Sequence, residues 1–174
     1  LPSVEMSGCL AAQVTEARER VRVAVKNSGI ILRPQKIMVN ISPADIRKAG
    51  NGFDLPVAAG ILAADGIIKT DMLESSVIIG ELSLDGSVNA VRGIINCVAK
   101  AAQMGFKRCI VPSCNICEGE HIEGIEVLGV DSLKQLIGYF NGESELIDAI
   151  DAKKSREHDV IHMKNETCPD FADI

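Results

Sequence analysis

Three residues in the second half of the sequence are of the types that bind zinc. Cys114, Cys117 and His121 form the pattern C-x2-C-x3-H. A structural zinc ion takes four ligands in a tetrahedral array, and the second ligand pair typical of zinc-binding sequences is absent. The alternatives are a redox-active cysteine pair, or two small apolar side chains three residues apart on a short helix. We favour the last interpretation and predict no metal site.

The glycine-containing stretch KAGNGFDLPVAAG, residues 48–60, raises the question of a phosphate-binding loop. Such loops follow the patterns G-x-x-x-x-G-K-[ST] or G-x-G-x-x-G, which place backbone N–H groups around the anion. The sequence contains neither pattern. We therefore predict that this chain binds no nucleotide and no other cofactor. Asp54, directly before Leu55 and Pro56, has the position of a helix N-cap.

Composition and length indicate a protein that folds in water. With 174 residues and 47% hydrophobic residues, the chain can bury one core, and we predict one domain over residues 1–150. Residues 151–174 are polar and read as a linker. No membrane-spanning run or signal segment is evident, and six cysteines without such a segment fit a reducing compartment. We predict a cytoplasmic protein without membrane contact. Because the first residue is Leu1 rather than Met, we expect a fragment.

Positive charge gathers near the beginning of the sequence. The net charge is -6 overall, but +4 over residues 1–50 and -8 over residues 51–150. A charged stripe is the usual exterior of a helix, so a solvated face is the favoured interpretation, and contact with nucleic acid or a partner is the alternative. The candidate nucleic-acid-binding residues are Arg18, Arg22, Lys26, Arg47 and Lys48.

Apolar periodicity predicts an alternation of strands and helices. Helical spacing marks 14–28, 55–64, a segment centred on Ile94 to Ala102, and 132–139; strands are predicted at 36–40, 77–79, 109–111 and 126–130. Gly29 and Gly105 stand where helix C-caps belong. Asp85-Gly86 lies between alternating apolar residues and predicts a hairpin. The fold class is therefore α/β, in two layers (α+β), with a mixed sheet and βαβ units packed by helices.

Four strings of the sequence together resemble one protein family. They are EARERVRVAVKNSG, NISPADIRKAGNGFDLPVAAGILAADG, IGELSLDGSVNAVRG and AAQMGFKRCIVP, in the same order and at matching spacing. The chain resembles the N-terminal, ChlI-like domain of the magnesium chelatase-related AAA ATPases, the ComM-like competence family, over roughly residues 1–140. The tail PDFADI resembles the start of the family's ATPase module. The family's first strand is expected to be missing.

The resemblance implies a fold and a setting. The domain is similar to the proteolytic domain of Lon, to the second domain of ribosomal protein S-five, and to the C-terminal domain of the RadA recombination proteins. By this resemblance, the parent protein would be an ATP-driven ring that acts on DNA in recombination or competence, with ATP and Mg²⁺ bound by the ATPase module. The partners would be that module, other copies in the ring, and DNA.

The resemblance to Lon also identifies two positions where catalytic residues would stand. Lon-type proteases use a serine nucleophile and a lysine base, which must lie within hydrogen-bond reach of each other. Laying the Lon patterns on this sequence puts Gly52 at the nucleophile and Ile95 at the base. Neither side chain can perform that chemistry. The loop at residues 48–54 therefore resembles a degenerate catalytic loop, and we predict no catalytic residues.

The favoured function is a non-catalytic domain that assists the ring by binding DNA or by ordering the subunits. One alternative is a Lon-like peptidase with another nucleophile, for which Ser42, Ser83 or Ser113 would have to serve. A second alternative is a protein-interaction domain without DNA contact.

Overall fold

The computed structural model describes residues 3–7, 12–42 and 52–149 of the chain. Arg47, Lys48 and the predicted linker 151–174 lie outside the described residues. The order of elements along the chain agrees with the predicted alternation of strands and helices. In the part described, no helix has the length and apolar character needed to cross a membrane.

The first unit is a βαβ arrangement in which β1 (Ser3–Ser7) and β2 (Lys36–Asn40) pair in parallel. Helix α1 (Ala12–Asn27) connects the two strands and buries the apolar face predicted from its spacing, including Val21 and Ala24. The helix ends at Asn27, and Gly29, two residues later, has φ +79°, as expected for a glycine that closes a helix. Strand β1 was not predicted.

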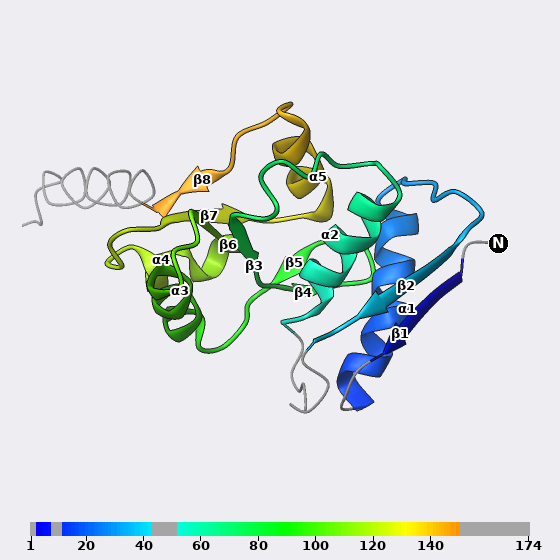
Figure 1. The fold of residues 1–174 in the computed structure, drawn as a ribbon, viewed down its shortest axis with the longest axis horizontal. Helices are drawn as coiled ribbons and strands as arrows, with labels where there is room; N and C mark the ends of the chain where they lie inside the picture. Colours follow the sequence, from blue (N-terminus) through cyan, green and yellow to red (C-terminus); the bar gives the residue numbers. More distant parts are fainter. Residues whose placement is uncertain (1–2, 8–11, 43–51, 150–174) are drawn as a thin grey trace, which may run out of the picture.

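Helix α2 (Asp54–Ala64) is apolar on almost every side and lies against α1 (Figure 1). Its buried residues join the larger of two apolar cores, together with α1, β2 and part of the second sheet. This agrees with the prediction that a helix without a polar face is buried all round.

The second sheet has four strands in the order β3 (Ser76–Ile78), β6 (Arg108–Pro112), β7 (Glu126–Val130) and β8 (Ile147–Asp148). The first three are parallel and β8 is antiparallel. Side chains alternate between the two faces of a strand. Ile110 and Leu128 accordingly join the larger core, whereas Cys109 and Val127 join the smaller one.

Different helices cover the two faces of this sheet (Figure 1). Helix α5 (Leu133–Asn141) supplies Leu136 and Phe140 to the larger core. Helix α3 (Ile94–Gln103) and the short α4 (Ile116–Gly119), which follows the 3-10 turn η1 (Ser113–Asn115), supply the smaller core. Coverage of both faces explains why residues 109–111 of β6 and 127–130 of β7 contain no polar side chain.

The predicted hairpin is present as β4 (Glu81–Leu82) and β5 (Val88–Asn89). Its turn closes with a hydrogen bond from Ser83 N–H to Ser87 C=O (2.9 Å), and Gly86 has φ +89°. The hairpin hydrogen-bonds to two helices: Leu133 N–H of α5 donates to Gly86 C=O (2.9 Å), and Asn27 Nδ2 of α1 donates to Leu84 C=O (2.8 Å). It therefore joins α1 to α5.

The predicted mixed α/β class is confirmed. Helices and strands that the sequence predicted appear with bounds shifted by one or two residues. The strands that were not predicted are β1 and β8, both short, whereas η1 and α4 lie where the favoured interpretation put a short helix with Cys114 and Cys117.

Candidate functional site

The loop that enters α2 is held by the backbone of a single residue, Gly80. Gly80 N–H donates to Gly52 C=O (3.2 Å), and Gly80 C=O accepts from Leu55 N–H (3.0 Å). A Cβ atom placed on Gly52 would lie 3.3 Å from Val91 Cγ1 and 3.4 Å from Ile79 Cγ2. The position predicted to correspond to the Lon nucleophile thus faces two apolar side chains.

The segment before α3 is fixed against this loop by the buried side chain of Asn115. Its Oδ1 accepts from Val91 N–H (2.9 Å), and its Nδ2 donates to Val91 C=O (3.1 Å) and to Glu118 Oε1 (2.6 Å). Val91 then contacts Gly52, while Ile95, in the first turn of α3, is 48% exposed. Direct proximity of Gly52 and Ile95 therefore stays a prediction, because the residue in contact with Gly52 is Val91.

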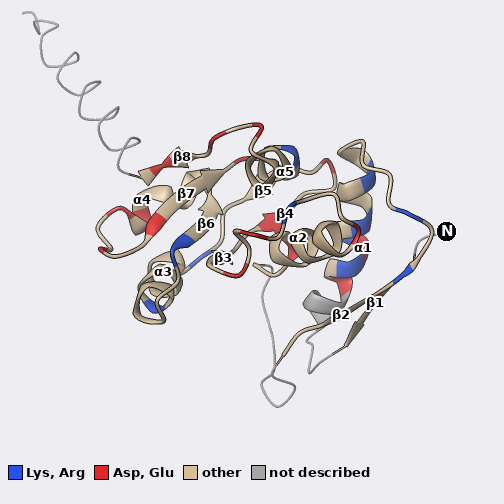
Figure 2. Cartoon of the chain, turned by 45° about the horizontal axis from the view of Figure 1, so that its top comes forward, with Lys and Arg blue, Asp and Glu red and all other residues tan. Residues whose placement is uncertain are grey.

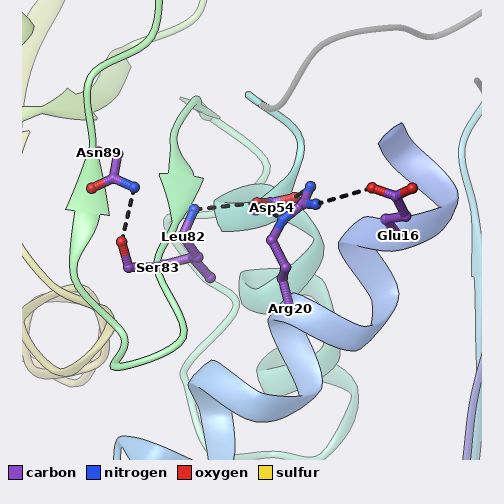
Figure 3. A network of polar contacts seen from close by, with 6 residues as sticks. All are labelled: Glu16, Arg20, Asp54, Leu82, Ser83 and Asn89. Atoms are coloured by element: carbon purple, nitrogen blue, oxygen red, sulfur yellow. Dashed lines mark hydrogen bonds and ion pairs between the residues drawn. The ribbon is translucent and has the colours of Figure 1, made fainter. Parts of the chain in front are cut away.

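The carboxylate of Asp54, two residues after Gly52, is completely buried and accepts three hydrogen bonds (Figure 3). Arg20 from α1 donates to it through Nε (3.0 Å) and Nη2 (3.1 Å), and Leu82 N–H from β4 donates to Oδ2 (3.3 Å). Glu16 lies 3.9 Å from Arg20. The hydrogen bond to Asp54 raises the pKa of Arg20 further above its ordinary value. A two-bond pairing of this kind is the strong form of a charged hydrogen bond.

The prediction that Asp54 caps α2 is wrong. The N-cap residue is Phe53, without a side-chain hydrogen bond, and Asp54 is the first residue of the helix. The reason is that Gly80 C=O already accepts from Leu55 N–H in the first turn. The Asp54 side chain is then free to point toward α1 and β4, where it ties three elements together.

The three serines considered as alternative nucleophiles lie in unrelated surroundings. Ser83 Oγ accepts a hydrogen bond from Asn89 Nδ2 (2.9 Å; Figure 3). Ser113 Oγ is buried and has no hydrogen-bond partner, and Ser42 is exposed. Within the described residues, no lysine donates to Ser83 or Ser113. The serine–base pairing that a Lon-like peptidase needs is therefore not supported at either position.

The cysteine–histidine pattern is spread over a short surface turn. Cys114 and Cys117 lie in η1 and α4 as predicted for a short helix, but both are exposed rather than apolar core residues. His121 is 71% exposed and lies 3.3 Å from Glu120. Over residues 3–7, 12–42 and 52–149, no group of three or more His, Cys, Asp or Glu side chains is arranged to hold a metal. Burial raises the pKa of the remaining core thiol, Cys109, to about 12, so it is inert.

The predicted basic stripe on α1 is exposed but partly neutralised (Figure 2). Glu19 lies 3.4 Å from Arg18 and 3.0 Å from Arg22, while Lys26 is exposed at the end of the helix. The structure does not describe Arg47 and Lys48, so their relation to α1 stays a prediction.

Sequence reasoning did not find the pair of Arg20 with Asp54. A usable signal was present, since Asp54 is the only charge between Gly52 and Ala64, and a carboxylate in an apolar helix needs a partner. Nothing in the sequence indicated that Arg20 is this partner, because it lies 34 residues before Asp54.

Comparison with known proteins places these features in a family. Residues 1–115 match the family model described as subunit ChlI of Mg-chelatase. The chain is similar to the uncharacterized protein YifB of Escherichia coli, with 36% identity over 84% of the chain and 29% of the relative. It is 30% identical to the competence protein ComM of Haemophilus influenzae over 99% of the chain and 33% of that protein. The chain thus spans about a third of the length of these relatives.

A more distant similarity supports the predicted fold. The archaeal Lon protease of Methanocaldococcus jannaschii is 24% identical over 78% of the chain and 20% of that protein. The mixed α/β arrangement described above is consistent with this Lon-like similarity. Because the family model covers well over half of the chain, the chain belongs to the magnesium chelatase-related AAA ATPase family, as a ChlI-type domain.

Proposed function

We propose that this chain is a non-catalytic accessory domain of an ATP-driven ring that acts on DNA. The observation that carries the proposal is the composition of the Lon-like site. Gly52 has no nucleophilic atom and faces Val91 and Ile79, and the adjacent carboxylate of Asp54 is occupied by Arg20 and Leu82 N–H. In this proposal, Gly52 and Asp54 stabilise the fold and take no part in peptide hydrolysis.

ATP and Mg²⁺ belong to the ATPase module of the parent protein in this proposal. The sequence has no phosphate-binding pattern, and the described residues offer no group of three or more metal-ligating side chains. The partners of the domain are its own ATPase module and neighbouring copies in the ring. Its task is to bind or steer DNA, or to order the ring.

The complete protein, with its ATPase module, provides the test of this role. We expect duplex DNA to raise its rate of ATP hydrolysis, and we expect removal of residues 1–149 to abolish that increase or to disperse the ring, as measured by ATPase assay and light scattering. Unchanged DNA stimulation and unchanged ring size after the removal would contradict the proposal. Loss of ring size alone, with DNA stimulation retained, would favour the protein-interaction alternative.

Peptidase activity is expected to be absent from the chain. Neither casein nor short peptides should be cleaved over hours, and a serine-directed fluorophosphonate should label no residue. The double variant Gly52→Ser with Ile95→Lys should recover no useful rate, because positioned substrate and oxyanion donors are also needed. Cleavage by the wild-type chain that disappears in Ser42→Ala, Ser83→Ala or Ser113→Ala would establish the peptidase alternative instead.

A further inference from the structure

The longest stretch of this acidic chain without an acidic residue is residues 86–117. Residues 86–117 carry four cations and neither Asp nor Glu, although the net charge of the chain is -6. The segment comprises β5, α3, β6 and η1. We infer that the outer face of α3 and its two flanks form a surface that binds the phosphate backbone of duplex nucleic acid. This inference rests on the proposed role of the protein on DNA.

The structure puts three of the four cations on one exposed feature. Arg92 immediately precedes α3, Lys100 lies within it, and Lys107 follows it before β6; all three are exposed. Figure 2 shows basic positions on α3 and at the start of β6, and no acidic position on α3. We call this surface the α3 face.

Helical spacing makes the centre of the α3 face polar and hydrogen-bonding. Ile94, Val98 and Ala101 are the buried residues of the helix. The residues opposite them are Asn96, Lys100 and Gln103, at intervals of four and three, and all are exposed. Lys, Arg, Asn and Gln are side chains that donate hydrogen bonds to phosphate oxygens. Asn96, Lys100 and Gln103 therefore line the centre of the outer side of α3, beside the exposed side chains of Ile95, Cys97 and Met104.

The cations of the α3 face are not neutralised by neighbouring acids. Arg92, Lys100 and Lys107 form no ion pair with any residue in the described ranges. The acids that follow on α4 and β7 are engaged elsewhere, since Glu118 accepts from Asn115 and Glu126 pairs with Arg108 at 2.9 Å.

Helix α1 differs in this respect. Glu19 contacts both Arg18 and Arg22, and Arg20 is committed to Asp54. A cation that must first give up an intramolecular partner gains less from a phosphate than one that is solvated. The α3 face is therefore the better nucleic-acid surface of the two, although α1 carries the more obvious stripe in the sequence.

The type of nucleic acid follows from what the α3 face lacks. Binding of single strands relies on exposed aromatic rings on which bases stack. The segment 86–117 contains one aromatic residue, Phe106, which is partly buried after α3. Phosphate contacts without base stacking predict binding to duplex backbone that is independent of base sequence and strongly dependent on salt.

The test compares two matched triple variants of the 174-residue chain, using fluorescence anisotropy with a labelled random-sequence duplex at several salt concentrations. One variant changes Arg92, Lys100 and Lys107 to Gln, and the control changes Arg18, Arg22 and Lys26 to Gln. All six residues are exposed, so the circular dichroism spectra of both variants should match that of the wild type.

We expect the first variant to lose at least tenfold in affinity and about 2.7 in the slope of log affinity against log salt, because each phosphate contact contributes about 0.9. The control should lose less than about threefold, because two of its three cations are already paired.

Three outcomes would overturn the inference: an equal or larger loss in the control, an unchanged salt slope in the first variant, or tighter binding of phosphatidylserine vesicles or polyglutamate than of duplex at equal salt. Failure of the inference is distinguishable from failure of the proposed function. If the chain binds no duplex but DNA still stimulates the ATPase of the complete protein only when residues 1–149 are present, the proposed role stands and the α3 face is rejected. If that stimulation is independent of residues 1–149 as well, both fail.

Discussion

Replacement of Asp54 by Ala is expected to lower the free energy of unfolding by about 3 kcal/mol, the usual effect of removing one partner of a buried ion pair. The carboxylate is fully buried and accepts from two guanidinium nitrogens and one backbone N–H. Its loss removes the two charged hydrogen bonds made by Arg20, whose side chain is only 25% exposed, and removes the acceptor of Leu82 N–H. The effect exceeds that of losing a helix cap, which is about 1 kcal/mol.

Urea denaturation distinguishes the loss of a buried ion pair from the loss of a helix cap. The four proteins compared are the wild type, Asp54→Ala, Arg20→Met and the double variant. A buried pair predicts that Arg20→Met is also destabilising and that the double variant costs less than the sum of the single ones. Glu16→Gln is the matched control on the same network. Its side chain is 72% exposed and 3.9 Å from Arg20, so a change under about 0.5 kcal/mol is expected. Full additivity of Asp54→Ala and Arg20→Met would refute the pair.

Gly86→Ala is expected to cost about 2 to 4 kcal/mol, because it combines backbone strain with a steric clash. The φ angle of +89° is one that residues with a Cβ rarely adopt. The added Cβ would also lie 2.3 Å from Ser28 Oγ and 3.5 Å from Ala24 C=O, both at the end of α1. Relief of the clash would require the buried Ser28 side chain to change rotamer, or the hairpin to move away from α1 against the hydrogen bond from Leu133 N–H to Gly86 C=O.

Gly105→Ala is the control for the backbone contribution alone. Gly105 has a similar φ of +81°, and nothing lies within 4 Å of an added Cβ. Its expected cost is about 1 kcal/mol. The double variant Gly86→Ala with Ser28→Gly should regain the free energy of unfolding that the steric clash removes. The remaining loss should equal that of Gly105→Ala. Thermal or urea denaturation measures all of these, and equal costs for Gly86→Ala and Gly105→Ala would show that the contact with Ser28 is unimportant.

Features with a local cause could be predicted from the sequence. The periodicity of α1, the all-apolar α2, and the strands β6 and β7 follow from which side chains must leave water. Gly29, Gly86 and Gly105 mark chain reversals because each needs a positive φ. The sequence also shows that Gly52 and Ile95 lack a nucleophilic or basic atom, whereas their correspondence to the Lon catalytic positions stays a prediction.

Features that depend on residues far apart in the sequence could not be predicted from it. Strand β1 has only five residues, and its pairing depends on β2, 33 positions later. The role of Asp54 depends on Arg20 and on the backbone of Leu82, and Asn115 reaches Val91 across 24 positions. The sequence pattern predicted that the Asp54 side chain would accept a hydrogen bond from the first turn of α2. It could not show that Gly80 C=O already accepts from Leu55 N–H in that turn.

The three contributors to the Asp54 contact also leave the ribosome at different times. Arg20 and Asp54 belong to the early part of the chain, whereas Leu82 N–H arrives only with the hairpin at 81–89. Until then, α1 and α2 can pack, but the carboxylate is one hydrogen bond short and its burial is incomplete. The hairpin therefore supplies the last of the three partners of Asp54 to be synthesised, and a chain that ends before residue 81 should be looser and more protease-sensitive around α1 and α2 than the full chain.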